Sequence, residues 1–384
     1  MTSEWRTIRA ADFIDFNPRL SLKKGDIATK VAMDKLKPFT KKIPETEKAE
    51  FNGGAKFCNG DTVMARITPC LENGKTAYVD MLDDGEIGFG STEFIVMRAK
   101  TGISDPQFVY YTAINPVFRN VAIKSMVGSS GRQRVQQSVL EELELSVPDL
   151  DEQRRIGDFL AKIDEKIALN DRTNDNLADL LQTIYQGRFG NDILAVNQGV
   201  LSDICSYSTD KVAVSELNVR TYFSTENMLS GKAGSTEATS LPTTSQTTAC
   251  HKGDTLISNI RPYFKKIVYC EDKCGCSTDV LCFTPSQPCY SAYLFSTLYA
   301  DKFFAFMVAG SKGTKMPRGD KQQIMTYPVV LPSEEELAGF NTIASPLLEQ
   351  IYSNRAENKR LSILRDTLLP KLMSGEIDVS AIQL

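Results

Sequence analysis

Two long stretches of the chain carry apolar residues at alternating spacings of four and three. The first stretch, residues 147–189, has apolar side chains at Ile156, Leu160, Ile163, Ile167, Leu177, Leu181 and Ile184. This spacing is typical of the narrow seam of a coiled coil rather than the broader apolar stripe of a helix on a globular domain. The pattern therefore predicts one long helix in the middle of the chain.

A second copy of this pattern begins 184 residues after the first, at Phe340 instead of Ile156. Its seam positions are Phe340, Ala344, Leu347, Ile351, Leu361, Arg365 and Leu368. One such helix would suit the surface of a large domain, but the repeat favours a pair. At 1.5 Å per residue each helix would be about 55 Å long, so the two can bury their seams against each other.

Asparagines interrupt both seams, Asn170 and Asn174 in the first helix and Asn354 and Asn358 in the second. Because a folded domain must fill the chain between the copies, we expect the helices to run antiparallel about a pseudo-twofold axis. Setting Asn170 opposite Asn358 also sets the other two asparagines opposite each other. Buried asparagine pairs fix a register, since a slipped helix would place them against leucine.

Three further positions refine the helix prediction. Each helix starts with the side chains of a capping box: Asp149 with Glu152, and Ser333 with Glu336. Pro346 lacks a backbone donor, so we expect a kink or a fresh helix start there. In the asparagine register Ile163 faces Arg365, in a seam that otherwise pairs apolar residues in nearly every layer.

The regions before each helix alternate short apolar runs with turn residues. Strands are predicted at Thr62–Ile67, Thr76–Val79 and Phe94–Met97, and helices at Pro106–Asn115 and Val117–Met126. The second region repeats landmarks of the first in the same order: Gly60–Pro69 with Gly253–Pro262, Ser91–Glu93 with Ser277–Asp279, and Met126–Gly131 with Met307–Gly313. These repeats predict a duplicated mixed α/β (α+β) fold. The expected domains are residues 1–146 and 191–331, with spacer helices in residues 147–190 and 332–384.

This order of variable domain, long helix, variable domain and long helix resembles the specificity (S) subunit of a type I restriction-modification enzyme over essentially the whole chain. The residues that carry the resemblance are Gly128–Arg134, Leu145–Pro148, Glu152–Gln153 with the seam to Ile167, Gly60–Thr62 and Leu368–Ile377. The resemblance implies two target-recognition domains separated by two antiparallel helices that form a coiled-coil spacer. It also implies a chain without catalytic residues.

The resemblance further implies a role in defence against foreign DNA. The chain would bind a bipartite asymmetric site in double-stranded DNA and direct adenine-N6 methylation by two methyltransferase (M) subunits and cleavage by restriction/translocase (R) subunits. S-adenosylmethionine, ATP and Mg would belong to those partners, with no cofactor on this chain. A spacer of about 55 Å would place the half-site centres up to about 16 base pairs apart.

The net charge of −4 and the pI near 5.4 provide no global attraction to phosphate, so local basic clusters must carry DNA binding. The two glycine-serine loops are the strongest candidates, because basic residues crowd them. The candidate DNA-binding residues are Arg66, Lys75, Lys124, Ser129, Ser130, Arg132, Gln133, Arg134, Gln136, Gln137, Asn259, Arg261, Lys265, Lys266, Ser311, Lys312, Thr314, Lys315, Arg318 and Gln322.

Few side chains suit catalysis or metal binding. His251 is the only histidine, and Asn73–Thr76 lacks the first glycine of a phosphate-binding loop. Six cysteines crowd the second domain: Cys250, Cys270, Cys274, Cys276, Cys282 and Cys289. Their spacing differs from paired zinc knuckles, so we predict buried thiols and no metal. A zinc-dependent nucleic-acid enzyme is one alternative function, and the specificity subunit of a type II-like (IIB or IIG) system is another.

The first residues, MTSEWRTIRAADF, lack the basic start and apolar run of a signal peptide. No apolar stretch reaches the length that a membrane-spanning helix needs. We therefore expect a cytoplasmic protein that does not contact a membrane, with its nine cysteines mostly reduced.

Overall fold

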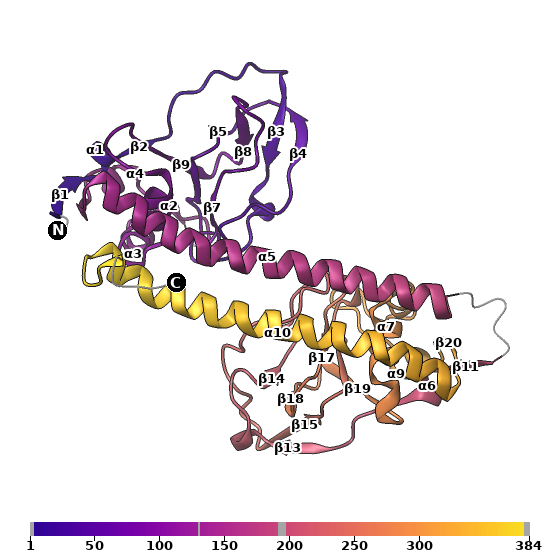
Figure 1. The fold of residues 1–384 in the computed structure, drawn as a ribbon. Helices are drawn as coiled ribbons and strands as arrows, with labels where there is room; N and C mark the ends of the chain where they lie inside the picture. The colour runs from indigo at the N-terminus through magenta and orange to yellow at the C-terminus, as the bar shows by residue number, and fades with distance from the viewer. Residues whose placement is uncertain (1–3, 130, 191–196, 380–384) are drawn as a thin grey trace. The chain divides into compact units, whose positions relative to one another are not determined.

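The computed structural model describes residues 4–129, 131–190 and 197–379, and the chain divides into two compact units. Unit 1 comprises Met1–Asn170 with Glu357–Leu384, and unit 2 comprises Asp171–Ala356. Two long helices, α5 (Leu150–Phe189) and α10 (Glu334–Met373), each supply a segment to both units. Figure 1 draws α5 in magenta and α10 in yellow.

Unit 1 contains short strands, short helices and the first part of α5. Its strands are β1 (Arg6–Arg9), β2 (Ile14–Phe16), β3 (Ile27–Val31), β4 (Glu47–Glu50), β5 (Ala55–Phe57), β6 (Thr62–Ala65), β7 (Thr76–Tyr78), β8 (Gly88–Gly90), β9 (Phe94–Ala99) and β10 (Glu144–Val147). Its shorter helices are α1 (Ala10–Phe13), η1 (Met33–Lys35), α2 (Pro106–Ile114), α3 (Pro116–Lys124) and α4 (Gln137–Glu141). The strands and helices predicted between residues 62 and 126 are therefore confirmed.

The strands of unit 1 form two four-stranded sheets and the two-stranded pair β1–β10. One sheet has the order β2-β9-β6-β7 and is antiparallel throughout, with Val63 of β6 opposite Val96 of β9 and Ala77 of β7. Every residue of β6 is buried, which explains its continuous run of apolar residues. The other sheet has the order β4-β3-β8-β5.

Local caps explain where α2 and α3 begin. Asp105 accepts a hydrogen bond from the backbone N–H of Phe108 at 3.0 Å, and Asn115 accepts one from Val117 at 3.0 Å. A proline follows each cap, at the position where a helix needs no backbone donor. Helix α2 then packs on the β2-β9-β6-β7 sheet with a face that includes the buried residue Phe108, and α3 packs against α2.

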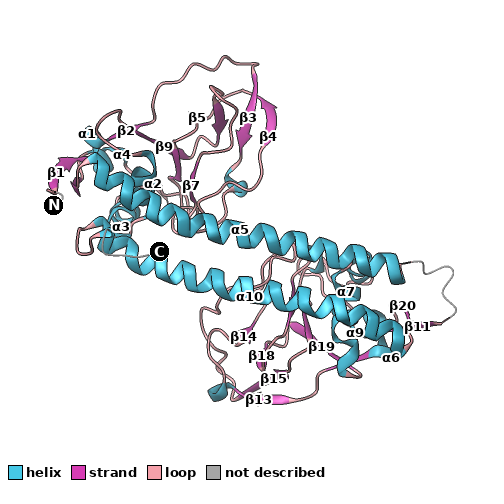
Figure 2. Ribbon diagram, in the orientation of Figure 1, coloured by secondary structure: helices cyan, strands magenta, loops and turns pink. Residues whose placement is uncertain are grey.

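Unit 2 repeats this plan. Its strands are β11 (Gln198–Val200), β12 (Cys205–Tyr207), β13 (Lys211–Ala213), β14 (Tyr222–Phe223), β15 (Gln246–Cys250), β16 (Thr255–Ser258), β17 (Ile267–Tyr269), β18 (Cys274–Cys276), β19 (Val280–Pro285) and β20 (Pro328–Val330). Its shorter helices are α6 (Leu201–Ile204), η2 (Val214–Glu216), η3 (Pro262–Phe264), η4 (Pro288–Tyr290), α7 (Ser291–Tyr299), α8 (Asp301–Ala309) and α9 (Lys321–Met325). Figure 2 distinguishes the strands from the helices in each unit.

The sheet order confirms the predicted duplication. The sheet β12-β19-β16-β17 of unit 2 has the same order as β2-β9-β6-β7, and β11–β20 matches β1–β10. The other sheets share three strands, because β3-β8-β5 has the same order and directions as β14-β18-β15. They add the fourth strand at opposite edges, β4 beside β3 in unit 1 and β13 beside β15 in unit 2. The two copies therefore share a mixed α/β core and differ at the edge of the second sheet.

The repeated Gly-Asp-Thr sequence forms the same turn in both units. Gly60 and Gly253 have φ of +92° and +91°, which favours glycine because an L side chain is strained there. Asp61 accepts a hydrogen bond from the backbone N–H of Cys58, and Asp254 accepts one from His251, each at 2.8 Å. The motif therefore starts the central strand of each main sheet.

The helix pair has the predicted antiparallel register within each unit. In unit 1, Asn170 donates a hydrogen bond to Asn358 at 2.8 Å and another to Glu357 at 2.7 Å. In unit 2, Asn354 donates to Asn174 at 2.9 Å. Every residue predicted to form the seam is buried or half-buried. The asparagine pairing predicted from the repeat is therefore confirmed at both pairs.

The exceptional seam residue Arg365 is buried in unit 1 with a carboxylate partner. Its Nη1 lies 2.6 Å from Oδ1 of Asp164, and both side chains are 6% exposed. The hydroxyl of Tyr111 donates to Oδ2 of Asp164 at 2.6 Å, and Lys41 Nζ lies 3.3 Å from that hydroxyl. Burial lowers the pKa of Lys41 to about 8. The seam therefore replaces one apolar layer by a buried charged network.

The ends of the helices agree with the predicted caps, and the interior of α10 contradicts the fresh helix start that was one of the two outcomes expected at Pro346. Ser333 and Glu336 each accept the other's backbone N–H, at 3.3 and 2.8 Å, which completes a capping box. Asp149 accepts the N–H of Glu152 at 2.9 Å. No fresh helix starts at Pro346, because α10 is continuous from Glu334 to Met373. Proline removes one backbone hydrogen bond, and the seam packing on both sides of it keeps the helix in place.

The asparagine pairs provide a stability prediction. Replacing Asn174 alone by leucine should lower the free energy of unfolding by about 1–3 kcal/mol, because it leaves the buried Asn354 without that partner. Replacing all four seam asparagines by leucine should instead raise it, because apolar pairs then fill both layers. Chemical denaturation of both variants measures the difference. A four-leucine variant less stable than the single variant would contradict the prediction.

Candidate nucleic-acid interface

The glycine-serine loop of unit 1 is a small hairpin after α3. Val127 and Arg134 exchange both backbone hydrogen bonds, at 2.9 and 3.0 Å, and Arg134 also forms a bridge with Ile67 beyond β6. Gly128 has φ of +134°, and a Cβ there would lie 3.0 Å from the carbonyl oxygen of Arg132. The loop therefore needs glycine to close and is anchored at the end of the central strand.

Unit 2 builds the same hairpin after α8. Lys312 and Arg318 exchange both backbone hydrogen bonds at 2.9 Å, and Arg318 also forms a bridge with Ile260 beyond β16. Gly313 has φ of +100°. The two loops that the sequence aligned thus occupy equivalent places, each at the same end of the central strand of its own sheet.

An arginine in each hairpin pairs with the acidic residue of the Ser-Thr-Glu or Ser-Thr-Asp repeat. Nη2 of Arg134 lies 2.6 Å from Oε1 of Glu93, and Nη2 of Arg318 lies 3.3 Å from Oδ1 of Asp279. The hydrogen bond from Arg134 lowers the pKa of Glu93. These arginines therefore anchor the hairpins to the sheets. Sequence reasoning noted both acidic repeats without assigning them this role.

The other candidates in the hairpins differ in exposure and in their partners. Lys312 pairs with Asp320 instead of remaining free, and the hydroxyl of Ser311 donates to the carbonyl of Val308 at 2.7 Å. Ser130 lies outside the described residues. The candidates with exposed side chains and no ion pair recorded among the described residues are Lys124, Ser129, Arg132, Thr314 and Lys315.

Several predicted residues have their polar atoms bound within the folded domains. Lys75 donates to the carbonyl of Met33 at 2.8 Å, and Lys266 donates to Thr225 at 2.6 Å. Burial lowers the pKa of Lys266. Lys265 lies 3.0 Å from Asp301. Their cationic groups are therefore committed to neighbours in this structure.

The strand-end candidates lie next to the hairpins. Nη2 of Arg66 lies 3.4 Å from the carbonyl of Val135, and the backbone N–H of Arg261 donates to Pro317 at 2.8 Å. The described residues offer no hydrogen-bond partner to Nε of either arginine or to Oδ1 of the buried Asn259. These three side chains therefore retain hydrogen-bonding capacity beside the hairpins.

The glutamine candidates are placed differently from one another. Gln137 accepts a hydrogen bond from Asn17 at 2.6 Å and donates to Glu141 at 2.7 Å. Gln136 and Gln322 are exposed, and Gln133 is half-buried. Of the four glutamines, Gln136 and Gln322 are therefore the two whose side chains face solvent.

Sequence reasoning missed an exposed aromatic pair in unit 2. Tyr263 and Phe264 are 50% and 38% exposed, and their ring centroids lie 4.7 Å apart. They lie between Arg261 and Lys265, both with left-handed backbone conformations. The sequence Arg-Pro-Tyr-Phe-Lys was a visible signal, because aromatic side chains flanked by cations suit stacking and phosphate contacts.

The cysteine-rich part of unit 2 forms a buried cluster. Cys250, Cys270, Cys274, Cys276 and Cys282 pack with Leu256 and Val268, and all are free thiols. Across the described ranges, no group of three or more histidine, cysteine, aspartate or glutamate side chains is arranged to hold a metal ion. The same ranges contain no helix long and apolar enough to cross a bilayer.

The chain is similar to known DNA-specificity proteins. Residues 3–178 match the family model described as "Type I restriction modification DNA specificity domain". The specificity subunits of the type I restriction enzymes EcoAI and EcoEI of Escherichia coli are 38% and 32% identical to it, over 27% and 29% of this chain. Each match spans only 18% of the relative's length.

A solved structure supports the fold over nearly the whole chain. The type I restriction-modification S subunit from M. genitalium is 18% identical, with 96% of both chains covered and a TM-score of 0.55. The first variable region with the start of α5 is thus similar to the DNA specificity domain of type I restriction-modification systems.

Proposed function

We propose that this chain is the DNA sequence-recognition subunit of a type I restriction-modification system and carries out no catalysis itself. The observation that carries the proposal is the pair of equivalent basic hairpins, each anchored by an arginine-carboxylate pair at a central strand. Each unit would read one half of a bipartite asymmetric DNA site. The exposed cations would contact phosphates, and adjacent polar side chains would contact base edges.

In this proposal the chemistry belongs to partner chains. Two methyltransferase subunits would bind S-adenosylmethionine and methylate adenine, and restriction subunits would bind ATP and Mg. The specificity subunit would direct both to one site. The relatives are named as specificity subunits of type I restriction enzymes, which supports the assignment of this chain to the specificity role.

Exchange of one variable region tests the proposal. Replacing residues 1–146 with the equivalent region of another specificity subunit should change one half of the methylated sequence and leave the other half intact. Methylome sequencing of a host that expresses the chimera together with its partner subunits measures this. The reciprocal exchange of residues 197–331 is the control and should change the opposite half. A chimera that alters both halves would contradict independent reading by the two units.

A further inference from the structure

Unit 2 carries an exposed aromatic tip, Tyr263 and Phe264, beside the hairpin that follows α8. Two neighbouring turns add the exposed side chains of Leu229 and Met316. A single exposed apolar side chain is common on a protein surface and needs no explanation. Several on adjoining segments favour an interaction surface instead.

Backbone hydrogen bonds hold the aromatic tip between these two turns. The N–H of Arg261 donates to the carbonyl of Pro317 in the hairpin at 2.8 Å, and the N–H of Gly231 donates to the carbonyl of Phe264 at 2.8 Å. Arg261 and Lys265, on either side of the tip, have φ of +50° and +51°, which is uncommon for residues other than glycine. Such conformations persist where the surrounding structure holds them, and they gather at functional sites. The tip is therefore fixed next to the hairpin that is proposed to contact DNA.

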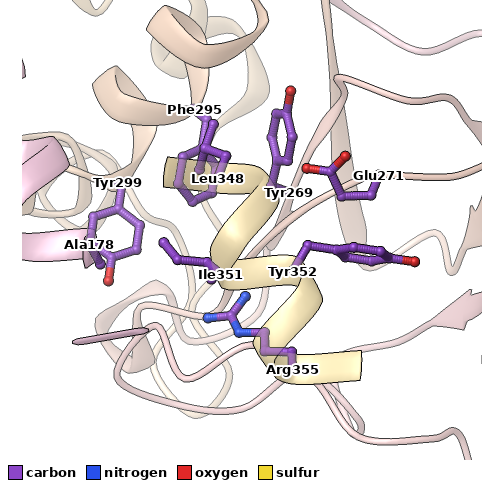
Figure 3. Close-up of a pocket in the computed structure, with 9 residues that line it drawn as sticks. All are labelled: Ala178, Tyr269, Glu271, Phe295, Tyr299, Leu348, Ile351, Tyr352 and Arg355. Carbon is purple, nitrogen blue, oxygen red and sulfur yellow. The ribbon is translucent and has the colours of Figure 1, made fainter. Parts of the chain in front are cut away.

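The turn at residues 229–234 rests on the interior of unit 2. Nζ of Lys232 lies 4.4 Å from the ring centroid of Tyr299. A Cβ on Gly234 would lie 3.1 Å from Cζ of Arg355, so the turn packs closely on that guanidinium group. Figure 3 shows Tyr299 and Arg355 among the residues that line one hollow of unit 2. The turn that bonds to the backbone of the aromatic tip therefore has a packed base.

The charges around the aromatic tip suit a polyanion. Nζ of Lys232 and Nζ of Lys265 lie 2.7 and 3.0 Å from one carboxylate oxygen of Asp301. The two lysines lower the pKa of Asp301, so the three groups together keep one net positive charge. Lys315 in the hairpin is exposed. Apolar rings among positive charges fit DNA, because its phosphates flank a stack of bases.

The two rings of the tip form a wedge. Their centroids lie 4.7 Å apart, and their planes are tilted by 55°. A base held between two rings needs parallel planes about 7 Å apart, twice the spacing of about 3.4 Å between stacked base pairs. The space between Tyr263 and Phe264 is therefore too small for a base, and only their outer faces can meet one. Apolar side chains used in this way enter duplex DNA by partly unstacking one base step and kinking the duplex.

The corresponding turn of unit 1 is different. At the positions that correspond to the aromatic tip, unit 1 has Cys70 and the buried Leu71. Phe39 is exposed beside this turn, where its N–H donates to the carbonyl of Gly74 at 2.9 Å. Cζ of Arg119 lies over the ring of Phe39, 5.2 Å from its centroid. Unit 1 therefore presents one ring that its own arginine covers, whereas unit 2 presents two adjacent rings.

We propose that the aromatic tip of unit 2 inserts into one base step of the DNA half-site that this unit reads, unstacks the two base pairs and kinks the duplex there. This inference rests on the proposed function, because it requires that unit 2 bind DNA. The expected insertion point is a pyrimidine–purine step, since such steps unstack most readily. Unit 1 reads its own half-site without this insertion.

Fluorescence of 2-aminopurine, an adenine analogue that brightens when it is unstacked, tests this proposal. The full chain is assembled with the proposed methyltransferase partner on a duplex that carries the methylated sequence. The analogue replaces each adenine in turn, except the methylated ones, because a methyltransferase moves its target base out of the stack. The wild type should brighten one step in the half-site that exchange of residues 197–331 assigns to unit 2.

Variants of the tip separate insertion from phosphate contact. Tyr263→Ala with Phe264→Ala should abolish the brightening and weaken binding by about tenfold, because both rings are lost. The slope of log K against log salt should stay the same, since the rings contact no phosphate. Tyr263→Phe is the matched control, because it removes only the hydroxyl, and it should keep both the brightening and the affinity. Tyr263→Ala alone changes the more exposed ring and should give a partial loss.

Three outcomes would each overturn the proposal. The wild type could brighten no step of that half-site, the brightening could persist in the double alanine variant, or that variant could lower the salt slope as a loss of phosphate contacts does. Sequence-specific binding without brightening would overturn this inference alone. A complex that binds no duplex in preference to random DNA would overturn the proposed function as well.

Discussion

Replacing Arg365 by methionine should destabilise unit 1 by about 3–5 kcal/mol, because removing one partner of a buried ion pair leaves the other charge unpaired. Asp164 would remain 6% exposed, with the hydroxyl of Tyr111 as its hydrogen-bond donor. Denaturant unfolding followed by tryptophan fluorescence measures this loss. Trp5 is the only tryptophan and packs against the core of unit 1, so its emission reports on the unit that contains the pair.

Removing Asp164, Arg365 and the Tyr111 hydroxyl together should restore most of the lost stability. A triple variant with Asp164→Leu, Arg365→Met and Tyr111→Phe replaces the charges and the hydroxyl by apolar groups of similar size, which is often neutral or stabilising. Arg154→Met is the matched control, because the pair of Arg154 with Asp151 is exposed. Such a pair contributes about 0–1 kcal/mol. A loss below 1 kcal/mol for Arg365→Met would show that the buried pair is not required.

Replacing Arg132 and Lys315 together by alanine should weaken DNA binding, and the defect should depend on salt. Each residue is exposed in its hairpin and is proposed to contact phosphate. Losing two phosphate contacts should reduce the slope of log K against log salt by about 2. The defect should therefore be about tenfold larger at 50 mM salt than at 200 mM. Fluorescence anisotropy of the complex assembled with the proposed methyltransferase partner measures both quantities.

A charge-matched control distinguishes phosphate contact from a general change in net charge. Lys24→Ala with Lys211→Ala removes two exposed lysines outside the hairpins, one from each unit. This variant should keep the wild-type slope of log K against log salt. Unchanged affinity of the hairpin variant at both salt concentrations would remove Arg132 and Lys315 from the interface.

The helices and their register were predictable because they depend on local periodicity. The four-three spacing specifies one apolar face whatever surrounds it, and the 184-residue repeat identified the partner face. The asparagines then selected one register, which the Asn170–Asn358 and Asn174–Asn354 hydrogen bonds confirm. The continuity of α10 across Pro346 was not predictable in this way, because it depends on packing on both sides of the proline.

The candidate site was only partly predictable. The repeats located both hairpins, but composition could not distinguish an exposed cation from one bound to a carboxylate. Arg134 and Arg318 pair with Glu93 and Asp279, which lie 41 and 39 residues away in sequence. The sequence established that these loops are basic, and the tertiary structure decided which of their charges remain free.

The same distinction applies inside the helix pair. Arg365 looked like an interruption of an apolar seam, and the sequence identified Ile163 as the residue opposite it. In the structure Arg365 pairs with the buried Asp164, the residue after Ile163, and with the exposed Asp366. The hydroxyl of Tyr111 from α2 donates to Asp164. Periodicity specifies which face of a helix is buried. The partner of a buried charge depends on side-chain geometry among segments far apart in the chain, so only the folded structure could identify it.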